Sequence, residues 1–187
     1  LVSGRIYLPK RRYLNGIVIA NHYTMTADTE VPSNMLSMES IFVLKGYAVI
    51  MPDYVCYGLS RHEVHPYLHW RNAALTAVDL LNRMPALLDY YGYSYPNDVV
   101  VTGYSQGAAV ALGVVRMLEE QGDTSPWLVR KLYAGAGPYD PAATYLYSVE
   151  RDTMGIPAAI PLIVMGLSDA YDLEFALEDF FLEPLLS

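Results

Sequence analysis

Ser105 is the residue of this sequence whose surroundings point most directly to chemistry. It lies in the run Gly103-Tyr104-Ser105-Gln106-Gly107, which has the Gly-x-Ser-x-Gly spacing of a serine on a sharp turn between a strand and a helix. A Cβ atom at either glycine would collide across so tight a turn. The serine hydroxyl can attack a carbonyl carbon there, and the N–H of Gln106 points at the oxyanion that results. The motif therefore predicts Ser105 as a nucleophile.

The residues on either side of the motif predict the strand and the helix that it requires. Residues 99–101 are all valine and follow the turn signal Pro-Asn-Asp at 96–98, which is typical of a short buried strand. Good helix formers dominate residues 108–120, and Gly122 can end that helix. A glycine-rich turn with an idle serine is the alternative, and this strand–turn–helix context makes it the weaker one.

Apolar runs that end at proline or glycine alternate with amphipathic stretches along the whole chain. The expected strands cover residues 5–9, 16–21, 47–51, 99–102 and 132–136, and the expected helices cover residues 33–45, 69–90, 108–120 and 140–151. This alternation predicts an α/β fold, in which a mainly parallel sheet has helices on both faces. The helix over residues 33–45 is expected to bury Met35, Met38 and Phe42, with Ile41 as a further candidate.

Composition and charge exclude several classes of protein. The chain has 187 residues, 53% hydrophobic and 17% charged, which fits one folded domain with a real core and excludes a disordered chain. Its net charge of −8 argues against nucleic acid and anionic membrane surfaces as partners. No apolar run is long enough to span a bilayer, and the single cysteine, Cys56, allows no intrachain disulfide. No signal peptide is visible, and because the chain opens on Leu1 within a strand-like run we expect an upstream segment.

Four stretches of the chain, taken together, carry a family resemblance. They are Ala20-Asn21-His22-Tyr23-Thr24, Met51-Pro52-Asp53-Tyr54 with Gly58 and Ser60, Gly103 to Gly107, and Ala136-Gly137-Pro138-Tyr139-Asp140. With these residues the chain resembles the α/β-hydrolase superfamily, and within it the secretory-lipase-like bacterial hydrolases. The resemblance implies acyl transfer through an ester on Ser105, no cofactor, and a secreted or cell-envelope location. It also implies that the N–H of Gln106 is one oxyanion donor and that the backbone of Tyr23 or Thr24 is the other.

The catalytic base is where the sequence departs from that family. The fold orders its triad as Ser, then Asp or Glu, then His. All four histidines here, His22, His62, His65 and His69, precede Ser105, and two strands of the usual sheet lack a counterpart. We therefore expect the N-terminal part of a longer hydrolase, with residues 1–152 as its core and residues 153–187 as the start of a cap or a linker. The catalytic base would lie in the missing C-terminal part of the same protein, and that part is also the partner that we expect for this chain.

The acid of the triad has more than one candidate. Residues 160–169 could form the next strand, which would put Asp169 where the fold expects its acid. The resemblance instead favours a helix over residues 158–167, the start of a cap, with the acid further along the chain. Asp140 is a weaker candidate, and Asp53 is expected to hold its loop through backbone hydrogen bonds.

His62, His65 and His69 have spacings of three and four residues, which can suit a metal site. Pro66 breaks any helix there, so the three rings would not share one face. A loop that lines the cleft and a cap for the following helix are the better interpretations, and the sequence predicts no metal site.

The patterns favour an esterase or lipase that hydrolyses a small-molecule or lipid ester. A peptidase of the same fold stays open, because the same serine chemistry cleaves amides. A non-catalytic binding module is the third hypothesis. The missing histidine favours it, and a strained serine turn opposes it, since a pure scaffold has no reason to keep such strain.

Overall fold

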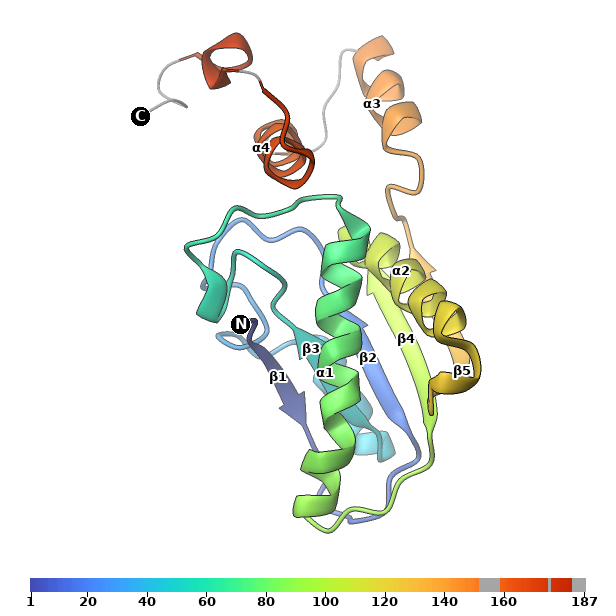
Figure 1. The fold of residues 1–187 in the computed structure, drawn as a ribbon. Helices are drawn as coiled ribbons and strands as arrows, with labels where there is room; N and C mark the ends of the chain where they lie inside the picture. Colours follow the sequence, from blue (N-terminus) through green and yellow to red (C-terminus); the bar gives the residue numbers. More distant parts are fainter. Residues whose placement is uncertain (152–158, 175, 183–187) are drawn as a thin grey trace.

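Five strands form one sheet that is parallel except at one edge (Figure 1). The computed structural model describes residues 1–151, 159–174 and 176–182. β1 runs antiparallel to β3, and the other neighbouring pairs are parallel, so the predicted α/β fold is confirmed. In spatial order the strands are β1 (Gly4–Tyr7), β3 (Ala48–Pro52), β2 (Ile17–Asn21), β4 (Asp98–Tyr104) and β5 (Leu128–Gly135).

The carboxyl ends of β2, β4 and β5 meet at one edge of the sheet. Asn21 of β2 lies opposite Gly103 of β4, and Tyr104 of β4 lies opposite Gly135 of β5. All five residues of β2 are buried, as expected of a parallel strand covered on both faces. Residues that follow these three strands are therefore brought together, at the edge where open α/β sheets bind their ligands.

Two long helices, α1 (Trp70–Tyr90) and α2 (Gln106–Gln121), pack against one face of the sheet (Figure 1). Their apolar faces bury side chains such as Leu81 and Val114 completely. Burial of one such side chain stabilises the fold by about 1.5–3 kcal/mol. α1 begins after His69, whose Nδ1 accepts a hydrogen bond of 3.3 Å from the N–H of Asn72, so the predicted cap is confirmed.

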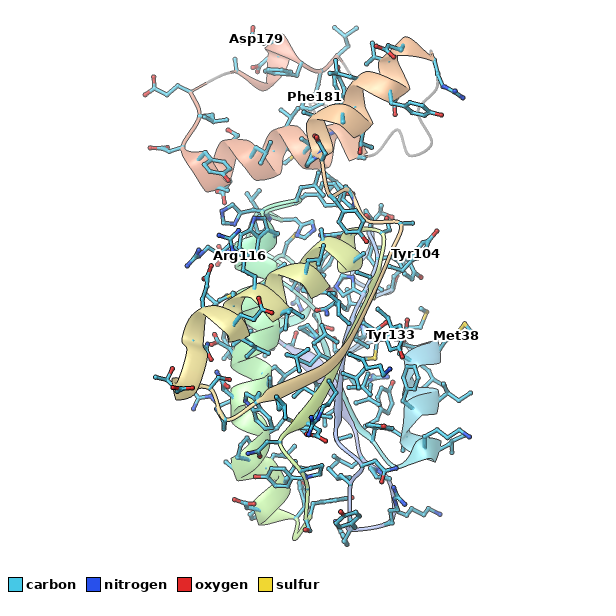
Figure 2. All side chains as sticks on the ribbon, turned by 90° about the vertical axis from the view of Figure 1, so that its right-hand side faces the viewer. Met38, Tyr104, Arg116, Tyr133, Asp179 and Phe181 are labelled. Atoms are coloured by element: carbon cyan, nitrogen blue, oxygen red, sulfur yellow. The ribbon has the colours of Figure 1, made fainter. Side chains whose placement is uncertain are left out.

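A 3-10 helix, η1 (Met38–Lys45), packs against β3 on the other face of the sheet. Figure 2 shows Met38 on the opposite side of the sheet from Arg116 of α2. The expectation that this segment buries an apolar face is wrong, because the four side chains expected on that face are exposed: Met35, Met38, Ile41 and Phe42. The three-residue turn of a 3-10 helix does not keep the spacing on which that expectation relied, and Val43 packs on the sheet instead.

Two further helices lie beyond the carboxyl ends of the strands (Figure 1). α3 (Pro141–Glu150) begins at Asp140, whose side chain accepts a hydrogen bond of 2.9 Å from the N–H of Ala143. α4 (Ala159–Tyr171) packs closely on the loop before α1, since a Cβ at Gly166 would lie only 2.6 Å from the carbonyl oxygen of His65.

The helical interpretation of the segment around residues 160–169 is confirmed, and the strand alternative is wrong. Pro161 falls in the first turn of α4, where a missing N–H costs the helix nothing. The predicted domain boundary between residues 152 and 153 lies outside the described residues and stays a prediction. None of the described helices is both long and apolar enough to cross a membrane.

Candidate active site

Ser105 occupies the turn between β4 and α2, in a backbone conformation that few residues other than glycine adopt. Its φ is 54° and its ψ is −123°, and it directly precedes the first residue of α2. Such a conformation costs about 1–3 kcal/mol and persists only where the surroundings hold it. One support is the N–H of Ser105, which donates a hydrogen bond of 2.9 Å to the carbonyl oxygen of Gly135 at the end of β5.

Both glycines of the motif are required by close backbone contacts, as the sequence predicts. A Cβ at Gly103 would lie 2.0 Å from the carbonyl oxygen of Gly107, across the turn itself. A Cβ at Gly107 would lie 2.2 Å from the carbonyl oxygen of Asn21, at the end of β2. Real Cβ atoms essentially never approach other atoms this closely, so the start of α2 sits directly on the end of β2.

This contact places the predicted oxyanion residues beside one another. Gln106 opens α2, and the loop with Tyr23 and Thr24 follows β2, against which α2 packs. Thr24 is fixed by a hydrogen bond of 2.8 Å between its hydroxyl and that of Tyr67, whereas the Tyr23 side chain is half exposed. The roles of these residues as oxyanion donors stay predictions, and the choice between Tyr23 and Thr24 stays open.

A cavity of about 260 Å³ opens beside Ser105. Its walls come from the core and from both C-terminal helices, and they include Leu68, Pro138, Tyr145, Ile160 and Ile163. A second cavity of about 230 Å³ shares Leu68 and Pro138 with the first. An apolar enclosure of this kind suits an apolar part of a substrate. The sequence did not predict the contribution of α3 and α4 to this wall.

His22 is held in the interior and cannot serve Ser105 as a base from there. Its ring stacks on that of Tyr54 with 3.9 Å between centroids, and its two nitrogens lie 2.7 and 3.1 Å from the carbonyl oxygens of Tyr23 and Asp53. Burial lowers the pKa of His22 despite these two contacts. The ring therefore ties the loop after β2 to the end of β3.

His65 is the other buried histidine, and it contacts the residue after the nucleophile. Its Nε2 lies 3.1 Å from Nε2 of Gln106, and its Nδ1 lies 3.1 Å from the carbonyl oxygen of Val55. Burial lowers its pKa to about 4. No sequence pattern signals this contact, because His65 and Gln106 belong to different loops. Of the other histidines, His69 caps α1 and His62 is exposed.

The acidic candidates separate clearly. Asp53 is fully buried, and its carboxylate accepts hydrogen bonds from the N–H of Ser33 at 2.9 Å and the hydroxyl of Ser3 at 2.6 Å, so its predicted role in holding the loop is confirmed. Asp140 caps α3. Asp169 is exposed on the helix α4 and does not line the cavity. It therefore does not follow a strand, which was the reason to consider it as the acid.

Within residues 1–151, 159–174 and 176–182, no group of histidine, cysteine and acidic side chains is placed to hold a metal ion. The three histidines of the loop before α1 do not form such a group, because His65 is buried against Gln106, His69 caps α1 and His62 is exposed. Over the same residues, no side chain hydrogen-bonds the Ser105 hydroxyl, so its general base is not found there.

Comparison with known proteins places this fold among hydrolases of known structure. No family model and no curated protein matches the sequence. A Legionella pneumophila protein described as a presumed hydrolase superposes with a TM-score of 0.85 at 22% identity, over 98% of this chain and 50% of its own. The rice cell wall degrading esterase LipA from Xanthomonas oryzae superposes with a TM-score of 0.73 at 21% identity, over the same shares of 98% and 50%. This chain thus spans about half the length of each, and over that half it has the α/β fold of these hydrolases.

Proposed function

We propose that this protein hydrolyses carboxylic esters through a covalent acyl intermediate on Ser105. The observation that carries the proposal is the backbone of Ser105, which is held at φ 54° between β4 and α2 beside a largely apolar cavity. A serine in this strained turn presents its hydroxyl to a substrate, which a serine inside a regular helix or strand does not. The hydrolase structures of the same fold support the reaction class.

In the proposed reaction the Oγ atom of Ser105 attacks the carbonyl carbon of the ester. As the new bond forms, the π bond of the carbonyl breaks and its oxygen becomes an oxyanion, which accepts hydrogen bonds from the N–H of Gln106 and from the N–H of Tyr23 or Thr24. The tetrahedral intermediate expels the alcohol and leaves an acyl group on Ser105, and water then releases the acid. Preorganised donors of this kind contribute about 3–4 kcal/mol each.

The Ser105 proton needs an acceptor, and we propose that a histidine and a carboxylate in a C-terminal part of the protein provide it. The order Ser, acid, His along this fold supports that assignment, and so does the doubled length of both superposed hydrolases. The same partner would cover the edge strand β5, which pairs only with β4 among the described strands.

The substrate class that we propose is a small-molecule or lipid ester with an apolar acyl group. The apolar wall that Ile160 and Ile163 add above Ser105 supports this class. The resemblance of the sequence further supports the secretory-lipase-like bacterial branch and a secreted or cell-envelope location. A non-catalytic binding module is the second candidate, favoured by one observation: no described side chain hydrogen-bonds the Ser105 hydroxyl.

A fluorophosphonate probe tests the proposal on the protein as its gene encodes it. The probe is expected to label the wild type at Ser105 and to leave Ser105→Ala unlabelled. Ser148→Ala is the matched control, because Ser148 lines the same cavity but donates its hydroxyl to the carbonyl oxygen of Thr144 at 3.0 Å. Equal labelling of Ser105→Ala and wild type would refute the nucleophile, and an unlabelled wild type would favour the binding module.

A further inference from the structure

Gln106 is fixed from the side by a residue of a distant loop. Its side chain is only 3% exposed, and its Nε2 lies 3.1 Å from Nε2 of His65. His65 is 5% exposed and belongs to the loop between β3 and α1. A buried hydrogen bond between two side chains so far apart in sequence ties the start of α2 to that loop.

The partners of His65 determine where its proton lies. The carbonyl oxygen of Val55 can only accept a hydrogen bond, so the Nδ1 atom of His65 that faces it must carry the hydrogen. In the neutral ring Nε2 is then an acceptor, and the amide of Gln106 donates to it. Protonation of Nε2 would remove this acceptor, and the pair could persist only if the Gln106 amide turned its oxygen toward the ring. Burial favours the neutral ring in the same direction, since it lowers the pKa of His65 to about 4.

Aromatic rings and the helix above fix the position of the His65 ring. Tyr57 and Tyr67 lie on either side in sequence, with ring centroids 5.1 and 5.7 Å from that of His65. Gly166 of α4 packs against the carbonyl oxygen of His65, where a Cβ atom would approach to 2.6 Å. The ring thus has one orientation, in which both of its nitrogens are engaged, and it has no free nitrogen for a substrate or for Ser105.

The strained turn needs such support on the side that faces the substrate. The φ of 54° at Ser105 is maintained by contacts at both ends: β5 holds its N–H, and the end of β2 packs on Gly107. The peptide N–H of Gln106 lies between these two contacts. The side chain of Gln106 is held by its hydrogen bond to His65, which belongs to another loop.

We propose that His65 is a positioning residue, which holds the Gln106 side chain so that the first N–H of α2 faces the oxyanion. This role rests on the ester hydrolysis proposed above. It predicts a histidine that matters for the rate and yet never exchanges a proton with the substrate. A change at His65 is then expected to lower kcat, since the misaligned donor acts on the transition state, and to leave KM nearly unchanged.

Two substitutions of His65 separate positioning from packing in the protein as its gene encodes it. His65→Leu keeps the volume but removes the acceptor, and kcat toward p-nitrophenyl butyrate is expected to fall about 10- to 100-fold, less than the loss for a deleted oxyanion donor. His65→Gln puts an amide oxygen near the former Nε2 and is expected to restore kcat to within about threefold of wild type. His62→Gln is the control, because His62 is exposed on the same loop and should leave the rate unchanged.

Gln106→Met provides the second test, which does not depend on the folding of a His65 variant. It removes the amide but keeps the apolar stem, and it is expected to slow the reaction as His65→Leu does. The double variant should be no slower than the slower single variant, because both changes remove the same hydrogen bond. Melting temperatures of all variants establish that the folded protein is compared.

The outcomes distinguish this role from the proposed function. If the fluorophosphonate probe labels wild type at Ser105 and the rates follow the order above, with an unchanged pH profile near neutrality, positioning by His65 is supported. If wild type is labelled but His65→Leu keeps its full kcat, or His65→Gln loses the neutral limb of the pH profile, positioning is wrong and the nucleophile stands. If wild type is not labelled, both proposals fall together.

Discussion

The contact between Gly107 and the end of β2 makes the substitution Gly107→Ala a sharp test of the site geometry. Within a helix such as α2, replacement of glycine by alanine normally stabilises by up to about 1 kcal/mol. Here the new methyl group would lie 2.2 Å from the carbonyl oxygen of Asn21 and 2.5 Å from that of His22. Both are backbone atoms, and neither can rotate away. We therefore expect the sign of the effect to be reversed.

The size of the loss follows from what would have to move. Relief of the clash needs a shift of roughly 1 Å between α2 and the end of β2, and Asn21 resists it, since its side-chain amide donates to the carbonyl oxygen of Thr102 at 3.1 Å. Forced overpacking of this kind costs about 1–3 kcal/mol. The upper half of that range, less the helix gain of up to about 1 kcal/mol, leaves a loss of about 1–2 kcal/mol for Gly107→Ala, or about 2–8 °C in melting temperature for a chain of this size.

Circular dichroism melting curves measure this loss, and Gly113→Ala in the same helix is the matched control. A Cβ at Gly113 would lie 2.6 Å from a ring carbon of Trp70, a side chain that can yield, so its loss should be the smaller one. The rate of fluorophosphonate labelling at Ser105 should fall in Gly107→Ala and not in Gly113→Ala. A Gly107→Ala protein that melts at or above the wild-type temperature would refute the close approach of α2 to β2.

Three further outcomes are expected. The unfolded chain protonates His65 near its ordinary pKa of 6.5, whereas the folded chain holds that pKa at about 4, so the free energy of unfolding should fall as pH drops from 6.5 to 4. The contribution of His65 to this fall is at most about 3 kcal/mol. Urea titrations between pH 6.5 and 4 should show that His65→Gln lacks this contribution. Asp53→Ala should lower the free energy of unfolding by about 1–3 kcal/mol, because it strands the N–H of Ser33, whereas Asp123→Ala at an exposed position should not; equal urea midpoints for the two would contradict this. The 187-residue chain by itself should hydrolyse p-nitrophenyl acetate hardly faster than buffer and should self-associate through β5, and a monomeric chain that turns over like an ordinary esterase would show that a base lies within it.

Local sequence patterns predicted those parts of the fold in which local and tertiary preferences agree. The valines at 99–101 and the glycines at 103 and 107 predict a strand, a turn and a helix, and the structure has all three in place. The long helix before them was predicted for the same reason, because Val78, Leu81 and Leu88 recur at helical spacing and are buried. Leu75, which was expected on the same face, is exposed. In such segments the backbone and the core favour the same conformation.

The prediction failed at η1 for the opposite reason. Met38, Ile41 and Phe42 have helical spacing, yet the segment forms a 3-10 helix that turns Val43 toward the sheet and leaves the other three exposed. Which residue of a short segment faces the sheet depends on where the chain enters and leaves it. Upstream of η1 the chain is held by the buried carboxylate of Asp53, which accepts a hydrogen bond from the N–H of Ser33, and no spacing rule contains such a contact.

The same limit applies to the site, and it indicates where substitutions will matter. The motif locates Ser105 because a strained turn leaves a glycine signature on both sides. The contacts that keep the turn in place come instead from Asn21, His65 and Gly135, which lie on three other segments and share no spacing with the motif. Strain of about 1–3 kcal/mol at one residue can be maintained only if several such contacts act together. A chain that keeps Gly-x-Ser-x-Gly but changes these supports would retain the sequence motif and lose the backbone geometry of Ser105 on which its proposed role as a nucleophile rests.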